Sequence, residues 1–325
     1  MSYAIRCHEY GGPEVMKWEE VDVPAPGPGQ AKIRHHYSGL NFIDIYHRTG
    51  LYPQPKFPFA LGTEGAGEVV EVGPGVTEVA PGDRVGYVSV IGSYSEERLI
   101  PAERLIKLPD SIDSKLAAAM MLQGMTVQYL IRRTFRVGPE TTMLLHAAAG
   151  GVGLIATQWA AHLGATVIGT VGSPEKAELA KAHGCAHVIN YNTENFVERV
   201  KDITGGKGVD VVYDSIGKDT FPASLDCLRP RGYWVTFGNA SGPVPPFQVG
   251  MLAQKGSLFA TRPTLNNYVA TREDLLATAQ DLFDVVANGH VKVAINQTYA
   301  VKDAADAHRD LEARKTTGST VLVVG

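Results

Sequence analysis

The stretch MLLHAAAGGVGLIA at residues 143–156 predicts the fold of the middle of this chain. It reads as an apolar strand that passes through a Gly-rich turn directly into an apolar helix. Small residues fill the three slots of the G-x-G-x-x-G fingerprint, namely Ala148, Gly150 and Gly153. Such a turn lets the backbone approach a pyrophosphate, which binds N–H groups at the positive end of the helix. Gly-rich turns occur in many proteins, so this interpretation as a dinucleotide-binding turn depends on the surrounding pattern.

The sequence after this turn alternates between strand and helix patterns. Besides the opening strand, strands are predicted at residues 165–171 and 187–190, a nearly all-apolar strand at 209–214, and short buried strands at 233–237 and 257–260. Helices are predicted at 174–183, with Ser173 as N-cap and Pro174 in the first turn, and at 193–203 and 220–228. This alternation predicts a doubly wound parallel sheet, a Rossmann domain at residues 123–261 that binds its ligand at the carboxyl edge.

The end of the second strand indicates which nucleotide is bound. An NAD site places Asp or Glu about 20 residues after the fingerprint, where it holds the ribose 2′-hydroxyl. Gly172 and Ser173 stand there instead, and Lys176 follows in the first helical turn. A 2′-phosphate would meet a hydroxyl, helix N-terminal amides and a cation, so the pattern favours NADPH. The alternative is that Lys176 is an ordinary solvated lysine.

Composition excludes several other classes of protein. The chain has 325 residues, 44% hydrophobic and 20% charged, with a net charge of −4, which is typical of a two-domain soluble enzyme. There is no basic block for nucleic acid, no apolar run long enough to insert into a membrane and no signal-peptide core at the start. Three separated cysteines predict reduced thiols rather than disulfides. We expect a cytoplasmic protein.

The two ends of the chain have a different pattern. Short strands separated by Gly and Pro turns are predicted at residues 31–36, 67–72, 84–88 and 98–101. After the Rossmann region, helices are predicted at 272–288 and 302–314, and a last strand at 319–324. We expect the C-terminal segment to pack onto the N-terminal one, forming a discontinuous β-rich domain from residues 1–122 and 262–325.

Four motifs carry a resemblance that extends over essentially the whole chain. GTEGAGEV at 62–69 and GDRV at 82–85 resemble the medium-chain dehydrogenase/reductase superfamily. NFIDIYHR at 41–48 and DSIG at 214–217 resemble its quinone oxidoreductase branch, which includes zeta-crystallin, and most closely the bacterial members. The resemblance implies an α/β fold in which the β-rich domain is GroES-like and catalytic. It also implies reduction of a small-molecule quinone by NADPH.

The zinc ligands of related alcohol dehydrogenases have no counterpart here. The His of their Gly-His-Glu motif corresponds to Thr63, their first zinc Cys to about Asn41, and their third ligand to a position near Gln123. Three scattered cysteines also leave no structural zinc lobe. Because zinc requires a closed set of thiolates and imidazoles, we expect neither catalytic nor structural zinc.

Without zinc, the main task of the protein in catalysis is to hold nicotinamide C4 against the substrate ring. The resemblance implies that Asn41, Tyr46 and Thr126 contact the nicotinamide and the substrate, and Tyr46 is a candidate proton donor. The alternatives are that Asn41 caps a turn and that Tyr46 is a core aromatic residue.

The resemblance also implies a set of cofactor contacts. Those to the pyrophosphate are Ala149, Gly150, Gly151 and Val152, and those to the 2′-phosphate are Gly172, Ser173 and Lys176. Tyr191 is implied for the adenosine, and Ser215, Phe237, Gly238, Asn239, Phe259 and Thr261 for the region where the cofactor crosses the sheet. Arg314 is implied for the adenosine phosphate. Its alternative role is a cation at a helix C-terminus, with Lys315 equally able to serve.

Three functions are compatible with these patterns. NADPH-dependent quinone reduction leads, and an enoyl or 2-alkenal reductase needs nearly the same architecture. A crystallin-like NADPH-binding protein without turnover is the alternative of another class. The predicted strand at 257–260 ends the sheet with an open edge, so we expect a homodimer joined there.

Overall fold

The computed structural model describes residues 1–325 and divides into two compact units. The first unit contains Met1–Met125, Val269–Ala287 and Val293–Gly325, and the second contains Thr126–Tyr268 and Asn288–Lys292. The sequence-based domain limits at residues 122/123 and 261/262 remain a proposal beside these contact-based ones. No helix is long and apolar enough to cross a membrane.

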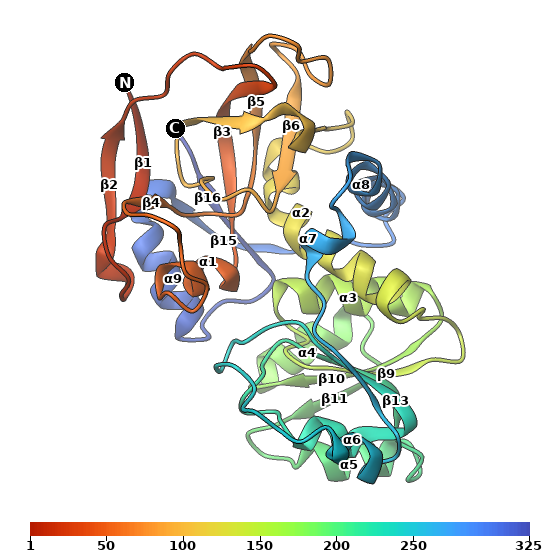
Figure 1. The fold of residues 1–325 in the computed structure, drawn as a ribbon. Coiled ribbons are helices and arrows are strands. Elements are labelled where there is room, and N and C mark those ends of the chain that lie inside the picture. Colours follow the sequence, from red (N-terminus) through yellow and green to blue (C-terminus); the bar gives the residue numbers. More distant parts are fainter. The chain divides into compact units, whose positions relative to one another are not determined.

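The second unit is built on a six-stranded, fully parallel sheet with the order β11-β10-β9-β12-β13-β14 (Figure 1). Its strands are β9 (Thr142–Leu145), β10 (Thr166–Val171), β11 (His187–Asn190), β12 (Val209–Asp214), β13 (Leu228–Thr236) and β14 (Phe259–Thr261). Counted from β9, this is the order 3-2-1-4-5-6 of the Rossmann fold, which places the reversal of strand order between β9 and β12. The predicted doubly wound sheet is confirmed.

Helices cover both faces of this sheet. They are α3 (Gly151–His162), α4 (Pro174–Ala182), α5 (Phe196–Ile203) and α6 (Gly250–Gln254), with a π-helical turn at Leu130–Thr134 and a 3-10 turn, η4 (Ala223–Cys227). On one face, Leu144, Ile168 and Val212 of the sheet pack with Val200 of α5 and Leu225 of η4 in one fully buried cluster. In Figure 1, α3 and α4 lie on the opposite side of the sheet from α5 and α6.

Three predicted elements of the second unit differ from the observed ones. The helix predicted at 220–228 is only the 3-10 turn η4, because Pro222 has no N–H to donate and disfavours helix in the residue before it. The helix predicted at 193–203 begins at Phe196, since the Asn195 side chain accepts from the N–H groups of the first turn. The strand predicted at 257–260 is β14, Phe259–Thr261, and it is not buried: Phe259 is 50% exposed. A short edge strand has only one neighbour to cover it.

The first unit is rich in β-structure. A three-stranded sheet has the order β2-β1-β4, and a seven-stranded sheet has the order β15-β16-β3-β5-β6-β8 with β7 paired to β3. The strands are β1 (Ser2–Cys7), β2 (Met16–Val21), β3 (Gln30–Leu40), β4 (Phe59–Ala60), β5 (Glu64–Val72), β6 (Arg84–Val88), β7 (Glu97–Pro101), β8 (Ile106–Lys107), β15 (Ile295–Ala300) and β16 (Ser319–Val323). The four predicted N-terminal strands are all present.

The C-terminal segment completes this unit, as expected. Strand β16 pairs with β3 in an antiparallel register, for example Val321 with Gly39. The remaining α-helices of the chain are α1 (Phe42–Arg48), α2 (Ser114–Tyr129), α7 (Leu265–Tyr268), α8 (Arg272–Ala287) and α9 (Ala304–Glu312), and three short 3-10 turns lie at Pro13–Val15, Ala102–Arg104 and Val301–Asp303. Helix α9 is shorter than the predicted 302–314, because Val301–Asp303 is a 3-10 turn and Arg314 has a φ of 59°.

Candidate active site

Most of the predicted cofactor residues follow the carboxyl ends of the parallel strands in the second unit. Carboxyl ends of parallel strands meet at one edge of the sheet, so the loops after them form a common surface. The loop after β9 carries Ala149 to Val152, the loop after β10 carries Gly172 and Ser173, Tyr191 follows β11, Ser215 follows β12, and Phe237, Gly238 and Asn239 follow β13. Phe259 and Thr261 lie in β14 itself.

The turn between β9 and α3 has the geometry of an anion-binding helix N-terminus. Gly150 precedes the first helical residue, and no side chain caps the helix there. Gly153 is sterically required, because a Cβ atom would lie 2.3 Å from the Ala147 carbonyl oxygen and 2.6 Å from the Ala148 carbonyl carbon. The helix therefore packs directly on the turn, with its first N–H groups available to a ligand.

The residues expected around the 2′-phosphate lie together with Tyr191, which is expected at the adenosine. A Cβ atom on Gly172 would be 2.5 Å from the Tyr191 hydroxyl oxygen, so these residues are in contact. Asn192 reinforces the contact by donating from Nδ2 to the Gly172 carbonyl oxygen at 2.7 Å. Ser173 is the N-cap of α4, and its hydroxyl accepts from the Lys176 N–H at 3.3 Å. The predicted cap is confirmed, and it places the Lys176 backbone beside Ser173.

The loops after β12 and β13 are also held side by side. The Ala240 N–H donates to the Ser215 carbonyl oxygen at 3.1 Å, and a Cβ atom on Gly238 would be 2.5 Å from that oxygen. Asp214, at the end of β12, stabilises the loop that follows this strand. Its fully buried carboxylate accepts hydrogen bonds from the N–H groups of Ile216 and Gly217.

In the first unit, the candidate residue Asn41 directly precedes helix α1. Its backbone N–H donates to the Asp44 carboxylate at 2.9 Å, which is the reverse half of a capping box. Asn41 is thus the N-cap residue of α1, and its backbone makes the capping hydrogen bond. This agrees with the alternative prediction that Asn41 caps a turn. Asp44 is fully buried and also accepts from the hydroxyls of Thr63, at 3.0 Å, and Tyr94, at 3.0 Å.

The side chain of Asn41 makes different contacts from its backbone. Its Nδ2 donates to Glu64 Oε2 at 2.8 Å, and its Oδ1 accepts from Gln123 Nε2 at 3.2 Å. The positions compared above with zinc ligands, Asn41, Thr63 and Gln123, thus lie in one hydrogen-bonded network of amides, hydroxyls and carboxylates. No group of three or more His, Cys, Asp or Glu side chains is placed to hold a metal ion.

Two buried carboxyl groups in this network have raised pKa values. Burial raises the pKa of Asp44 to about 7 and that of Glu64 to about 8, because a carboxylate loses its hydration there. The hydrogen bonds from Asn41 to both groups act in the opposite direction. Burial of two acids so close together is costly, and such clusters are more typical of functional sites than of ordinary cores.

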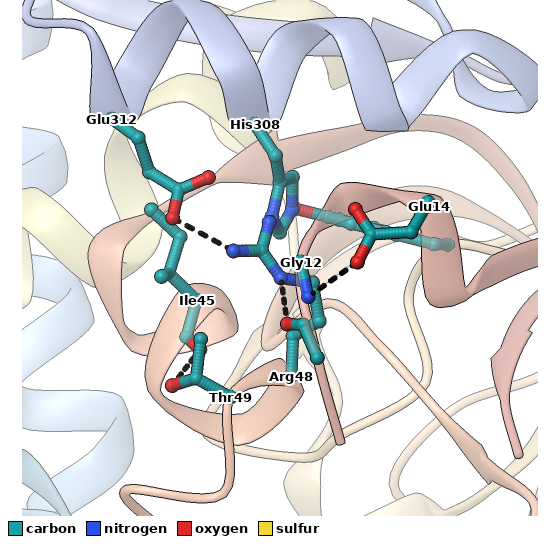
Figure 2. Close-up of polar contacts among 9 residues, drawn as sticks. Gly12, Glu14, Ile45, Arg48, Thr49, His308 and Glu312 are labelled. Carbon is teal, nitrogen blue, oxygen red and sulfur yellow. Dashed lines mark hydrogen bonds and ion pairs between the residues drawn. The ribbon is translucent and has the colours of Figure 1, made fainter. Parts of the chain in front are cut away.

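Helix α1 is fixed at its other end by Arg48, which is 1% exposed (Figure 2). Its guanidinium donates to Glu312 Oε1 at 2.7 Å, to His308 Nδ1 at 3.0 Å and to the Gly11 carbonyl oxygen at 3.1 Å. Burial, and then the Arg48 charge, lower the pKa of His308 to about 3, so its imidazole is neutral. Arg48 can only donate, so His308 Nδ1 must accept and carries no proton. We therefore assign the imidazole proton to Nε2, which lies 3.3 Å from the Tyr94 hydroxyl oxygen. Tyr94 then donates to Asp44, so hydrogen bonds connect both ends of α1.

The remaining candidates come from different segments of the chain. Tyr46, on α1, is buried and packs edge-on against Tyr52 with ring centroids 5.2 Å apart, which agrees with the aromatic core role considered as its alternative. Thr126, on α2, belongs to the second unit, whereas Arg314 follows α9 in the first unit and is exposed. The site roles of all three remain predictions.

Sequence reasoning did not single out Asp44, Glu64 or Arg48. Asp44 stands three residues after Asn41, which is the spacing of a capping box and a usable signal. Glu64 opens a strand whose next residues are Gly, Ala and Gly, and an acid in such a buried strand is itself unusual. Nothing in the sequence connects Arg48 with Glu312.

Comparison with known proteins gives matches along nearly the whole chain. Residues 27–110 match the family described as alcohol dehydrogenase GroES-like domain, and residues 151–277 match zinc-binding dehydrogenase. A quinone oxidoreductase of Pseudomonas aeruginosa is 52% identical over 324 residues, which cover 99% of this chain and 100% of the relative. A 2-haloacrylate reductase of a Burkholderia species is 50% identical over 331 residues, covering 99% of each chain. The crystal structure of an Escherichia coli quinone oxidoreductase complexed with NADPH has a TM-score of 0.97 at 49% identity, covering 99% of each chain.

Proposed function

Because the chain belongs to the quinone oxidoreductase family of the medium-chain dehydrogenases/reductases, we propose that it reduces quinones with NADPH. In this reaction the two electrons arrive as a hydride, a proton is taken up, and the products are the hydroquinone and NADP⁺. The observation that carries the proposal is the loop surface of the second unit, where a Gly-rich helix N-terminus and a carboxylate-free strand end lie on one sheet edge.

The residues present fit NADPH. The turn around Gly153 has no room for a side chain and leaves the N-terminus of α3 uncapped, as a pyrophosphate requires. The Gly172 and Tyr191 contact and the Ser173 cap form a polar surface at the end of β10. Gly172 and Ser173 stand where an NAD site has its acid, and the nearby Glu175 of α4 is hydrogen-bonded to the Ser173 side chain. We propose that these residues, together with Lys176 and Arg314, hold the adenosine half of the cofactor. Bound NADPH supplies the hydride.

The protein's own part in the reaction is positioning. Quinone reduction spreads the incoming charge over a conjugated ring and two oxygens, so hydrogen-bond donors can replace a Lewis acid. We propose that Asn41 supplies such a donor. Tyr46 and Thr126 are proposed to orient the rings.

The test is NADPH oxidation measured across a panel of quinones and 2-alkenals. We expect quinones to give the highest kcat/KM. The 2-haloacrylate reductase among the relatives favours a second candidate, reduction of activated alkenes, and higher kcat/KM values for alkenals would select it. Tight NADPH binding without turnover of any acceptor would instead indicate the crystallin-like role.

Zinc is not expected to take part. Asn41, Thr63 and Gln123 provide only amide and hydroxyl groups at the positions compared with zinc ligands, which form a poor site for this ion. We predict that activity persists after exhaustive chelation and that elemental analysis finds no stoichiometric zinc. Activity lost on chelation and restored by zinc alone would overturn this prediction.

We also propose a homodimer that pairs at β14. This strand ends the sheet, and Phe259 is 50% exposed and stacks on Tyr233 with ring centroids 4.6 Å apart. Sedimentation should give twice the 34.9 kDa chain mass, and Phe259→Lys should shift the protein toward monomer. Leu276→Lys, an exposed residue of α8, is the control and should leave the mass unchanged. A native chain that sediments as a monomer at micromolar concentration would contradict the proposal.

A cytoplasmic location is proposed as well. It is supported by the three cysteines, Cys7, Cys185 and Cys227, which are buried free thiols. Cell fractionation that recovers the native protein in another compartment would contradict it.

A further inference from the structure

We propose that Glu64 is a positioning residue, which fixes the Asn41 side chain as a hydrogen-bond donor to the carbonyl oxygen of the substrate. The inference rests on the proposed function and names the feature of the substrate that the site recognises. That feature is a carbonyl conjugated to a double bond, which quinones and 2-alkenals share.

The direction of each hydrogen bond around Asn41 follows from its partners. Glu64 is fully buried, and one of its oxygens accepts from the Leu122 N–H at 2.8 Å while the other faces Asn41. On the other side, the Ser319 hydroxyl donates to Gln123 Oε1 at 2.7 Å, which turns Gln123 Nε2 toward Asn41. In this structure the Asn41 oxygen thus faces Gln123, and its nitrogen faces Glu64.

This arrangement leaves one defined hydrogen on Asn41. Its Nδ2 carries two hydrogens, and the structure uses one of them for Glu64. Its Oδ1 is already occupied by Gln123. Asn41 is 8% exposed, so part of the residue stays accessible in an otherwise buried network. Asn41 can thus offer a ligand an N–H group, and the hydrogen bond from Nδ2 to Glu64 holds that group in one orientation.

An N–H donor suits the proposed substrate class. When a hydride reaches a conjugated carbonyl compound, negative charge develops on the carbonyl oxygen. A donor that is already oriented stabilises this charge without reorganisation during the reaction. A rotated Asn41 would present an oxygen lone pair instead and would oppose the reaction.

The first test is the substitution Glu64→Gln, alone and combined with Asn41→Ala. The introduced glutamine has only one acceptor oxygen for two donors, so its amide must face either Asn41 or Leu122 unfavourably. We expect kcat/KM for a quinone such as 1,4-benzoquinone to fall about ten- to a hundredfold. In the Asn41→Ala background, Glu64→Gln should add less than about a twofold change, because both residues act through one group. The Kd for NADPH is measured by calorimetry in each variant, which separates an effect on cofactor binding from the effect on kcat/KM.

The second test is the exchange Asn41→Asp/Glu64→Gln. The introduced glutamine can then donate to the introduced aspartate and accept from Leu122, while the aspartate still accepts from Gln123. All four partners are satisfied and the total charge is conserved, so thermal stability should recover from the Glu64→Gln value. The aspartate has no N–H to offer, so kcat/KM should stay as low as in Asn41→Ala. An exchange variant with restored activity would overturn the proposal.

The controls separate the possible failures. Glu97→Gln makes the same chemical change in strand β7, where Glu97 pairs with the exposed Arg34, and should leave kcat/KM unchanged. Should Asn41→Ala itself retain full activity, the proposed role of Asn41 fails. If Asn41→Ala is impaired but Glu64→Gln is fully active, or additive with it, only the role of Glu64 is excluded. The recovery of stability in the exchange variant is measurable even if no quinone is reduced.

Discussion

Substitution of Lys176 by Ala is expected to weaken NADPH binding by about ten- to a hundredfold, which is the loss of one charge-assisted contact to phosphate. NADH lacks the 2′-phosphate, so its Kd should be nearly unchanged. Lys176 lies in the first turn of α4, beside the Ser173 cap and at the strand end where no carboxylate stands. Calorimetric titration with both nucleotides measures the effect, and added salt should reduce the native preference for NADPH.

Arg314→Ala is the companion variant, with a loss of the same order expected for NADPH alone. The two losses need not add, because both cations are proposed to share one phosphate. Lys181→Ala, at the other end of α4, and Arg309→Ala, on α9, remove equal charges elsewhere and should have little effect. Equal weakening of NADH and NADPH would show that these side chains support the fold or the common pyrophosphate instead.

Substitution of Gly153 by Ala is expected to be disruptive, although Gly to Ala within a helix is usually stabilising by about 1 kcal/mol. The added methyl group would lie 2.3 Å from the Ala147 carbonyl oxygen, so helix and turn must separate. We expect a loss of about 1–3 kcal/mol in unfolding free energy. Displacement of the N–H groups that are proposed to bind the pyrophosphate should lower nucleotide affinity about a hundredfold. Thermal unfolding and calorimetric titration measure the two effects.

Gly150→Ala is the matched control for stability. A Cβ atom there has the Ala147 oxygen 3.4 Å away as its nearest neighbour, and the backbone φ of −80° suits any residue. This variant should therefore unfold like the native protein, whatever it does to pyrophosphate binding. A Gly153→Ala protein with native stability and native nucleotide affinity would contradict the prediction. It would show that α3 can shift away from the turn without loss of unfolding free energy.

The Rossmann unit was predictable because its signals are local. Each strand is a short apolar run, and Ser173, Pro174 and the glycines are specific to the turns they occupy. The predictions were wrong where tertiary packing or a backbone restriction determines the secondary structure or the burial of a segment. Pro222 prevents the helix expected at 220–228, and Phe259 in β14 is exposed because an edge strand lacks a second neighbour.

The candidate site was predictable only in part. The cofactor loops follow from strand order, and Asn41 came from the family resemblance. The network behind Asn41 did not follow, because its members come from distant segments. Glu64 lies on β5, Gln123 on α2 and Ser319 on β16, and no pattern of residue types announces which of them will meet.

The ion pair between Arg48 and Glu312 joins residues that are 264 positions apart in the sequence. This separation has a consequence for synthesis on the ribosome. The six strands of the parallel sheet lie in one continuous stretch, so that sheet can close while the C-terminus is still being made. The N-terminal unit has to wait, because β3 lacks its neighbour β16 and the Arg48 guanidinium lacks its partner carboxylate until the last helix emerges. The part of the chain that is translated first is thus among the last to complete its native contacts.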